Sequence, residues 1–204
     1  MRVTNLYPGS YASNCYLVES DGEAILIDPS IPVGDALRLL GTLPRITAIL
    51  LTHGHFDHTL ALDGWRTHTG APLAIHEADA PMLTDARLSC YRTFLGSDVT
   101  FAPPERLLHE GDTVSVGNES LTVLSVPGHT PGSIALLGDG RLFTGDTLFA
   151  EGGYGRTDLP GGDSRALVAS LRRLLSLPGE YRILPGHGEA TDRKTAAAMF
   201  SNLM

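Results

Sequence analysis

Four strand-length apolar runs in this 204-residue chain each lead directly into side chains that can bind a metal. "AILLT", "LTVLSVPG", "GRLFTG" and "YRILPG" are followed, respectively, by the hexapeptide His53-Gly-His55-Phe-Asp57-His58, by His129, by Asp146 and by His187. Strand ends on one rim of a sandwich converge, so five histidines and two aspartates are expected to meet at one place. A fold that brings four strand ends to one rim is therefore required.

The hexapeptide is the strongest of these signals. Alternation along an extended segment points His53 and His55 the same way, while Asp57 and His58 begin the next element. Four such side chains at this density would be costly to bury without a metal or mutual pairing. A single Gly-His or Gly-Asp is more typical of a turn or a helix cap, and the glycine before each of the other three positions allows a sharp turn.

The pattern of elements predicts a layered α/β fold, α+β by some schemes, with two sheets in a sandwich and helices outside. Strands are expected at 14–20, 23–29, 46–52, 72–77, 112–117, 119–128, 133–140, 140–146 and 181–186, and helices at 34–43, 60–70, 164–177 and from about Asp192. The continuous apolar run at 46–52 suits a strand covered on both faces. We expect residues 84–104 to form a lid or a short helical insert within a single domain that spans 1–204.

Composition excludes several classes of protein. The net charge of -8 and the absence of a basic run argue against a nucleic-acid partner. No apolar stretch approaches the ~20 residues that a transmembrane helix needs. The N-terminal residues lack a continuous apolar run and are interpreted as mature protein, so we expect a cytoplasmic location with Cys15 and Cys90 reduced. His68, His76 and His109 lie outside every motif and are expected at the surface or in packing contacts.

The four motifs together resemble the metallo-β-lactamase-fold hydrolase superfamily, in its glyoxalase II-like branch. They read T-H-G-H-F-D-H, P-G-H-T-P-G-S, F-T-G-D-T-L-F and L-P-G-H-G, and the resemblance runs from about Ser13 to Gly188. "GYGRTDLPGGD" (153–163) also resembles the small single-domain members. The resemblance implies an αβ/βα sandwich with a metal site along one edge. It assigns His53, His55 and His129 to one metal and Asp57, His58 and His187 to a second, with Asp146 as the bridge.

The implied chemistry is metal-dependent hydrolysis. Imidazole and carboxylate side chains are good ligands for two divalent cations. We expect zinc, with iron or manganese as alternatives. Such a pair can share a hydroxide that attacks a carbonyl or phosphoryl centre, with Asp57 and Asp146 as the catalytic carboxylates. Asp28, at the end of "AILID", either receives an imidazole N–H from a ligand or caps the strand end. Arg156 either anchors an anionic part of the substrate or pairs with Asp158 or Asp163.

Three functions compete. The first is hydrolysis of a small-molecule thioester, as in hydroxyacylglutathione hydrolase, and the second is oxidation at a single iron, as in the persulfide dioxygenases. A non-catalytic metal-binding or partner-binding domain is third, and seven ligands argue against it. True β-lactamases are set aside because they carry a cysteine ligand at the position of Asp146 and are exported. The nuclease branch is set aside because it generally needs an inserted domain and a basic surface, neither of which this sequence indicates. Because a C-terminal glutathione-binding domain is not expected, glutathione recognition is open, as is the oligomeric state.

Overall fold

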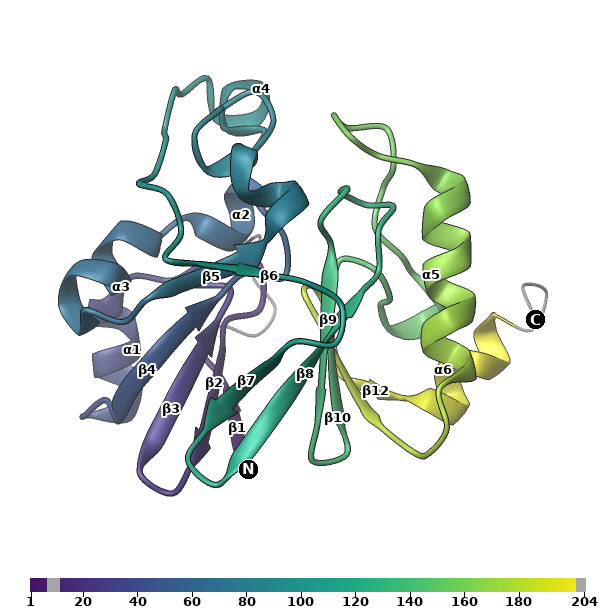
Figure 1. Cartoon of the computed structure of the whole chain (residues 1–204), viewed down its shortest axis with the longest axis horizontal. Helices are drawn as coiled ribbons and strands as arrows, with labels where there is room; N and C mark the ends of the chain where they lie inside the picture. Colours follow the sequence, from purple (N-terminus) through teal and green to yellow (C-terminus); the bar gives the residue numbers. More distant parts are fainter. Residues whose placement is uncertain (7–11, 201–204) are drawn as a thin grey trace.

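Two mixed sheets, each of six strands, face one another in the computed structural model, which describes residues 1–6 and 12–200 (Figure 1). In spatial order the first sheet contains β1 (Arg2–Asn5), β2 (Tyr16–Ser20), β3 (Glu23–Ile27), β4 (Arg45–Leu50), β5 (Leu73–His76) and β6 (Arg106–Leu108). Strands β1 to β3 are antiparallel neighbours, whereas β3 to β6 pair in parallel. Parallel neighbours end at the same edge, which places the segments after β3 and β4 side by side.

The second sheet is formed by the rest of the chain. In spatial order it contains β12 (Thr191–Asp192), β11 (Arg182–Pro185), β10 (Arg141–Gly145), β9 (Ile134–Gly138), β8 (Glu119–Ser125) and β7 (Thr113–Val116). Only β10 and β11 pair in parallel, and the other neighbours are antiparallel. The segments after β10 and β11 therefore leave the sheet at the same edge.

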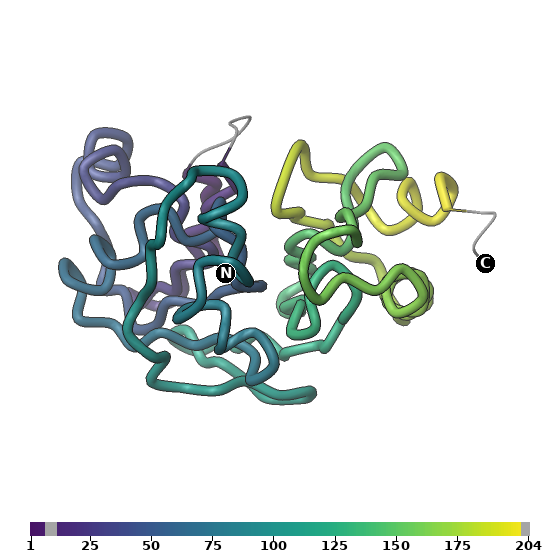
Figure 2. Tube along the Cα trace, turned by 90° about the horizontal axis from the view of Figure 1, so that it is seen from above, coloured from purple at the N-terminus to yellow at the C-terminus, as the bar shows by residue number. Residues whose placement is uncertain are grey.

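Helices cover the outer faces of both sheets, as Figures 1 and 2 show. Beside the first sheet lie α1 (Val33–Leu40) and α3 (Leu62–Thr69), and beside the second lie α5 (Ser164–Ser176) and α6 (Arg193–Met199). Short helices occupy the connecting loops: α2 (Phe56–Thr59), η1 (Glu77–Leu83), α4 (Tyr91–Leu95) and η2 (Ala150–Gly152). Across residues 1–6 and 12–200, no helix has the length and apolar character needed to cross a membrane.

Alternating side chains divide the core into layers. In β3, Ile25 and Ile27 belong to the cluster between the sheets, while Ala24 and Leu26 belong to the cluster under α1 and α3. A third cluster lies between the second sheet and α5 with α6. The predicted αβ/βα sandwich is confirmed, and β4 has buried side chains on both faces, as its continuous apolar run predicts.

Three strands, β1, β6 and β12, were not predicted from the sequence. All three are short. The strands β1, which is only half-buried, and β6 lie at the outer edges of the first sheet, and β12 lies at an edge of the second. Edge strands need no continuous apolar run, so periodicity gives little sign of them. The predicted helix end at Gly70 is confirmed, since Gly70 has φ +64° at the C-cap of α3. The predicted helix at 34–43 ends earlier, at Leu40, because Gly41 takes φ +76°.

Candidate metal centre

The seven predicted ligand residues lie together where strands of both sheets end. His53 and His55 follow β4, His129 follows β8, Asp146 follows β10 directly, and His187 follows β11, with Asp57 and His58 on α2. Within two sets of three, a ligand-type atom from each residue lies within 4.8 Å of the others. We call His53, His55 and His129 the first ligand group, and Asp57, His58 and His187 the second ligand group.

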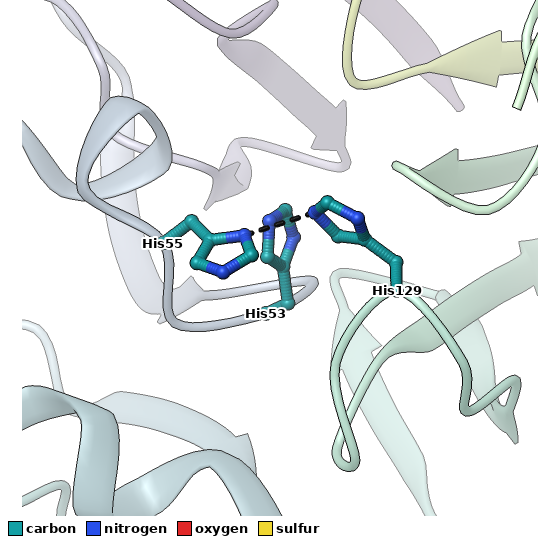
Figure 3. A group of neighbouring side chains, drawn as sticks. All are labelled: His53, His55 and His129. Carbon is teal, nitrogen blue, oxygen red and sulfur yellow. Dashed lines mark hydrogen bonds between the residues drawn. The ribbon is translucent and has the colours of Figure 1, made fainter. Parts of the chain in front are cut away.

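The first ligand group brings two loops together. Figure 3 shows the three rings pointing toward one another, His53 and His55 from the loop after β4 and His129 from the loop after β8. The Nδ1 atom of His55 lies 2.9 Å from Nε2 of His129, and the ring centroids of His53 and His129 are 4.7 Å apart. All three side chains are buried.

The second ligand group is more open to solvent. His187 Nε2 lies 3.1 Å from Asp57 Oδ2, and the exposed fractions of these two side chains are 29% and 17%, respectively. His58 is fully buried, and its ring centroid is 5.4 Å from that of His187. The second ligand group is thus the part of the site that solvent and substrate reach more easily.

Asp146 lies between the two groups. Its Oδ1 atom is 3.2 Å from Nε2 of His58, while Oδ2 is 3.6 Å from Nε2 of His129 and 3.5 Å from Nε2 of His187. Asp146 also joins His53 and His58 in a third potential metal-binding set. One carboxylate therefore faces histidines of both groups, as a bridging ligand would.

Several polar atoms at this point are buried without a hydrogen bond in the described structure. They are Nε2 of His53, His55 and His58, and Oδ1 of Asp146. An unsatisfied buried polar atom costs about 1–3 kcal/mol, so four at one place need a common partner. Imidazole nitrogens and carboxylate oxygens are the donor atoms that divalent zinc, iron and manganese accept. The residues present therefore fit divalent metal ions.

Hydrogen bonds outside the ligands orient two of the histidine rings. His58 Nδ1 lies 2.9 Å from Asp28 Oδ2, and His129 Nδ1 lies 2.7 Å from the backbone oxygen of Arg156. Each oxygen can only accept, so each Nδ1 donates, and a neutral ring then presents the lone pair of Nε2 to the centre. Asp28 also accepts from Thr52 N at 2.8 Å and from Thr52 Oγ1 at 2.7 Å, which joins β3 to β4.

Burial and neighbouring ionisable groups together set the protonation of the ligands. It lowers the pKa of His53 well below its ordinary value, and burial together with the neighbouring His129 lowers the pKa of His55 to about 3. Both rings are therefore neutral and can bind a metal at neutral pH. Burial alone would raise the pKa of Asp146, but the nearby His58, His129 and His187 lower it, which keeps the carboxylate ionised.

Glycine allows the close approach of these loops at two positions. Gly145, before Asp146, has φ +46°, a backbone conformation that favours glycine, and its predicted role in a sharp turn is confirmed. Gly186, before His187, serves differently. A Cβ atom there would lie 2.2 Å from Asp146 Oδ1, so a side chain at this position would displace the carboxylate.

Asp79 is a buried residue of this site that the sequence analysis missed. Its Oδ2 accepts hydrogen bonds from Gly54 N at 3.1 Å and from Thr130 Oγ1 at 2.7 Å, and its Oδ1 accepts from Gly132 N at 2.7 Å. Gly54 stands between His53 and His55, and Thr130 follows His129. Asp79 therefore joins the two loops of the first ligand group. An aspartate just after a strand also suits a helix start, so its sequence carries no distinguishing signal.

A pocket of about 360 Å³ opens beside the ligands. The segment 84–104, predicted as a lid or insert, contributes Cys90 and Phe94 to its lining. Arg156 also lines it, but its side chain pairs with Asp158 through two contacts of 2.6 Å. That pairing is the alternative to the predicted anion anchor, which stays a prediction. Of the histidines outside the motifs, His68 and His109 are exposed and His76 is half-buried.

Comparison with known proteins identifies the family. Residues 8–187 match the metallo-beta-lactamase superfamily. A probable metallo-hydrolase of Bacillus subtilis, YqgX, is 37% identical, with 90% of this chain and 89% of the relative covered. The hydroxyacylglutathione hydrolase GloC of Haemophilus influenzae is 34% identical, with coverage of 89% and 88%.

Solved structures agree with these relatives. BLEG-1, a B3 metallo-β-lactamase, has a TM-score of 0.88 at 32% identity and covers 100% of this chain and 99% of its own. TTHA1623 in a di-iron-bound form has a TM-score of 0.79 at 39% identity, with coverage of 97% of each chain. ETHE1 from Myxococcus xanthus has a TM-score of 0.73 at 30% identity, with coverage of 97% and 82%.

The similarity to BLEG-1 changes one expectation. The β-lactamases were set aside because of a cysteine ligand and export, yet one solved β-lactamase aligns over the whole chain at 32% identity. β-Lactam hydrolysis therefore needs a direct test. The sandwich, the buried histidine and aspartate cluster and the matched sequence agree on the broader class. The chain belongs to the metallo-β-lactamase superfamily and is a metal-dependent hydrolase of that fold.

Proposed function

We propose that the protein is a thioesterase that uses two divalent metal ions, and that zinc is the metal at both positions. The observation that carries the proposal is the pair of ligand groups that share Asp146 and border an open pocket. A structural metal site seldom needs a second cation or an open position beside it. The hydroxyacylglutathione hydrolase GloC, which is 34% identical over most of both chains, supports a thioester as the substrate.

The first ligand group would hold one metal, the second ligand group the other, and Asp146 would touch both. When bound, such ions supply an activated water near neutral pH and stabilise the oxyanion of the attacked carbonyl. Asp57 and Asp146 both line the pocket. Burial would raise the pKa of each, but contacts with neighbouring histidines lower it, so as ionised carboxylates they could accept a hydrogen bond from the attacking water. Asp28 and the Arg156 backbone oxygen keep His58 and His129 in the tautomer that ligation needs.

The side chains lining the pocket argue against a protein nucleophile. Among the described lining residues, Cys90 carries the one thiol, and burial raises the pKa of that thiol above its ordinary value. A protonated thiol is a weak nucleophile, so Cys90 is not suited to attack the thioester carbon, and water activated by bound metal ions would supply the nucleophile. Cys15 and Cys90 are both free and buried, which accords with the proposed cytoplasmic location.

The experiment combines metal analysis with a substrate panel. We expect elemental analysis of zinc-loaded protein to approach two equivalents per chain, and we expect hydrolysis of thioesters in a spectrophotometric thiol assay. A β-lactam chromogen tests the activity of BLEG-1, and oxygen consumption with glutathione persulfide tests dioxygenase chemistry. Persistent binding of a single iron with oxygen uptake, or turnover of the β-lactam alone, would contradict the thioesterase proposal.

A further inference from the structure

Apolar side chains form most of the pocket wall beyond the metal ligands. The lining residues that are not ligands are Phe56, Cys90, Phe94, Phe149, Gly155, Arg156 and Leu159. Three of these are phenylalanines, from three separate segments of the chain. Binding pockets of this kind take their affinity from apolar contact and their orientation from a few polar groups, here the metal ligands.

Two of the phenylalanines form a continuous surface. The rings of Phe56 and Phe94 stack with centroids 5.2 Å apart and an interplanar angle of 20°. Phe56 stands inside the ligand hexapeptide, between His55 and Asp57, and is buried. Phe94, on α4, is 43% exposed although it is a large apolar residue. An exposed aromatic ring beside a pocket has apolar area that a ligand can cover.

Arg156 is the one Lys or Arg side chain among the described lining residues, and its charge is already balanced. Its Nε and Nη2 atoms each contact a different oxygen of Asp158 at 2.6 Å, and its Cζ lies 5.9 Å from the centroid of Phe94. Nε and Nη2 form one bidentate edge of the guanidinium, so Asp158 already holds that edge and balances the charge of Arg156. The segments outside the description, 7–11 and 201–204, contain no Lys or Arg in their sequence.

The volume of the pocket favours one part of a thioester. At about 360 Å³ it is near the lower end of the range for ligand sites. Biological thiol carriers are large and polar, and keep their charged groups hydrated when they extend into solvent. A compact acyl group is the part that fits against the phenylalanines while its carbonyl faces the metal ligands.

We propose that this pocket selects the acyl group of the substrate and accepts an uncharged, apolar one, with Phe94 as the residue that sets the preference. The proposal rests on thioester hydrolysis as the proposed function. An apolar acyl group that packs against Phe56 and Phe94 loses water from its surface without losing any hydrogen bond of its own. A carboxylate at the same place would lose its hydration and would have to compete with Asp158 for Arg156.

The test uses two acyl groups of matched shape on one neutral thiol, N-acetylcysteamine. The 4-methylpentanoyl group replaces the carboxylate of succinyl with an isopropyl group of similar size. We expect kcat/KM of the zinc-loaded protein to be at least about tenfold higher for 4-methylpentanoyl. Phe94→Ala should reduce the ratio of 4-methylpentanoyl to acetyl turnover by about tenfold. Leu95→Ala, next to it on α4 but outside the lining, should leave that ratio unchanged.

Equal or faster turnover of succinyl would overturn the proposal, and so would the same change of ratio in both variants. If the loaded protein hydrolyses no thioester, the proposed function fails, and calorimetric titration of the same protein still decides the pocket's preference. Binding of 4-methylpentanoate about tenfold tighter than succinate, and weakened in Phe94→Ala, would support an apolar pocket. Equal binding of the two acids would contradict it.

Discussion

At Asp146 the two carboxylate oxygens face different histidines. Oδ1 lies toward His58, and Oδ2 lies toward His129 and His187. His187, in contrast, contacts Asp57 and is the most exposed of the histidine ligands. Two residues of the same cluster therefore differ in how many metal positions depend on them.

We expect Asp146→Ala to reduce the occupancy of both metals, because one carboxylate serves both groups. His187→Ala should leave the first metal bound and weaken only the second, by at least about tenfold, because loss of even an outer partner of a ligand costs that much. Elemental analysis after dialysis against a weak chelator measures both. Retention of one full equivalent in Asp146→Ala, or loss of both in His187→Ala, would show that the roles are assigned wrongly.

Arg156 permits a prediction that separates its two interpretations. Because Asp158 already occupies its guanidinium, Arg156→Ala should change KM equally for succinyl and 4-methylpentanoyl thioesters. An anion anchor would instead show a selective rise in KM of about tenfold, or roughly 1.4 kcal/mol, for the succinyl thioester alone. Asp158→Asn is the matched control, because it weakens the ion pair between Arg156 and Asp158 but keeps the arginine in place.

At the scale of elements, η1 holds the two loops of the first ligand group through Asp79. Burial raises the pKa of Asp79, but its three hydrogen-bond donors counteract that effect. Two of the donors are backbone N–H groups that find no other partner if the carboxylate is removed. The positions of His53, His55 and His129 thus depend on an element that contributes no ligand.

Asp79→Ala should lower the free energy of unfolding by about 3 kcal/mol, because buried N–H groups lose their acceptor. It should also weaken the first metal more than the second, as competition with a chromogenic chelator would measure. Asp192→Ala is the control, since it removes an N-cap on α6 that accepts from Thr195 N, at a cost of about 1 kcal/mol. Equal metal affinity in both variants would make Asp79 a purely structural residue.

The loop after β10 passes very close to the first ligand group. A Cβ atom on Gly155 would lie 2.0 Å from the Asp146 backbone oxygen and 2.8 Å from His129 Nδ1. Gly155→Ala should therefore shift His129 and lower affinity for the first metal by about tenfold. Gly64→Ala is the control, because nothing lies within 4 Å of its Cβ position in α3, and it should stabilise the protein by about 0.5–1 kcal/mol. Unchanged metal affinity in Gly155→Ala would show that a side chain at this position does not displace His129.

On the scale of the whole molecule, the metal centre joins the two halves of the sandwich. His53, His55, Asp57 and His58 come from the half that contains the first sheet, and His129, Asp146 and His187 from the half that contains the second. Ions held by both halves stabilise the folded state by a free energy that grows with the logarithm of their affinity. Metal removal by a chelator should lower the melting temperature by several degrees, and zinc should restore it, as scanning calorimetry would show. No change on removal would mean that the ligands bind no metal in the folded protein.

The metal-free protein should also become less stable as the pH falls. Burial lowers the pKa of His53 and His55, so their contribution is present above about pH 6.5 and is lost toward pH 3. His58 acts in the opposite sense: burial would lower its pKa, but Asp28 and Asp146 raise it. With two rings against one, the melting temperature of the metal-free protein should be lower at pH 5 than at pH 7.5. A higher value at pH 5 would contradict this balance.

The sequence by itself determined the layered fold and the set of ligand-type residues. Each such residue follows an apolar run within a few positions, so strand periodicity and the turn glycine before Asp146 locate it at a sheet edge. The resemblance of four motifs divided those residues between two metals. Strand periodicity and short motifs each depend on residues that are close together in the chain, so a single sequence is enough to recognise them.

Only the tertiary structure decided what surrounds that centre. Asp79 meets Gly54 and Thr130, Phe94 stacks on Phe56, and Arg156 pairs with Asp158. The first two contacts join segments that are distant in the chain, and the third selects one of two carboxylates that the loop offers. Such choices depend on how the sheets and loops pack against one another, and no periodicity of a single segment encodes them.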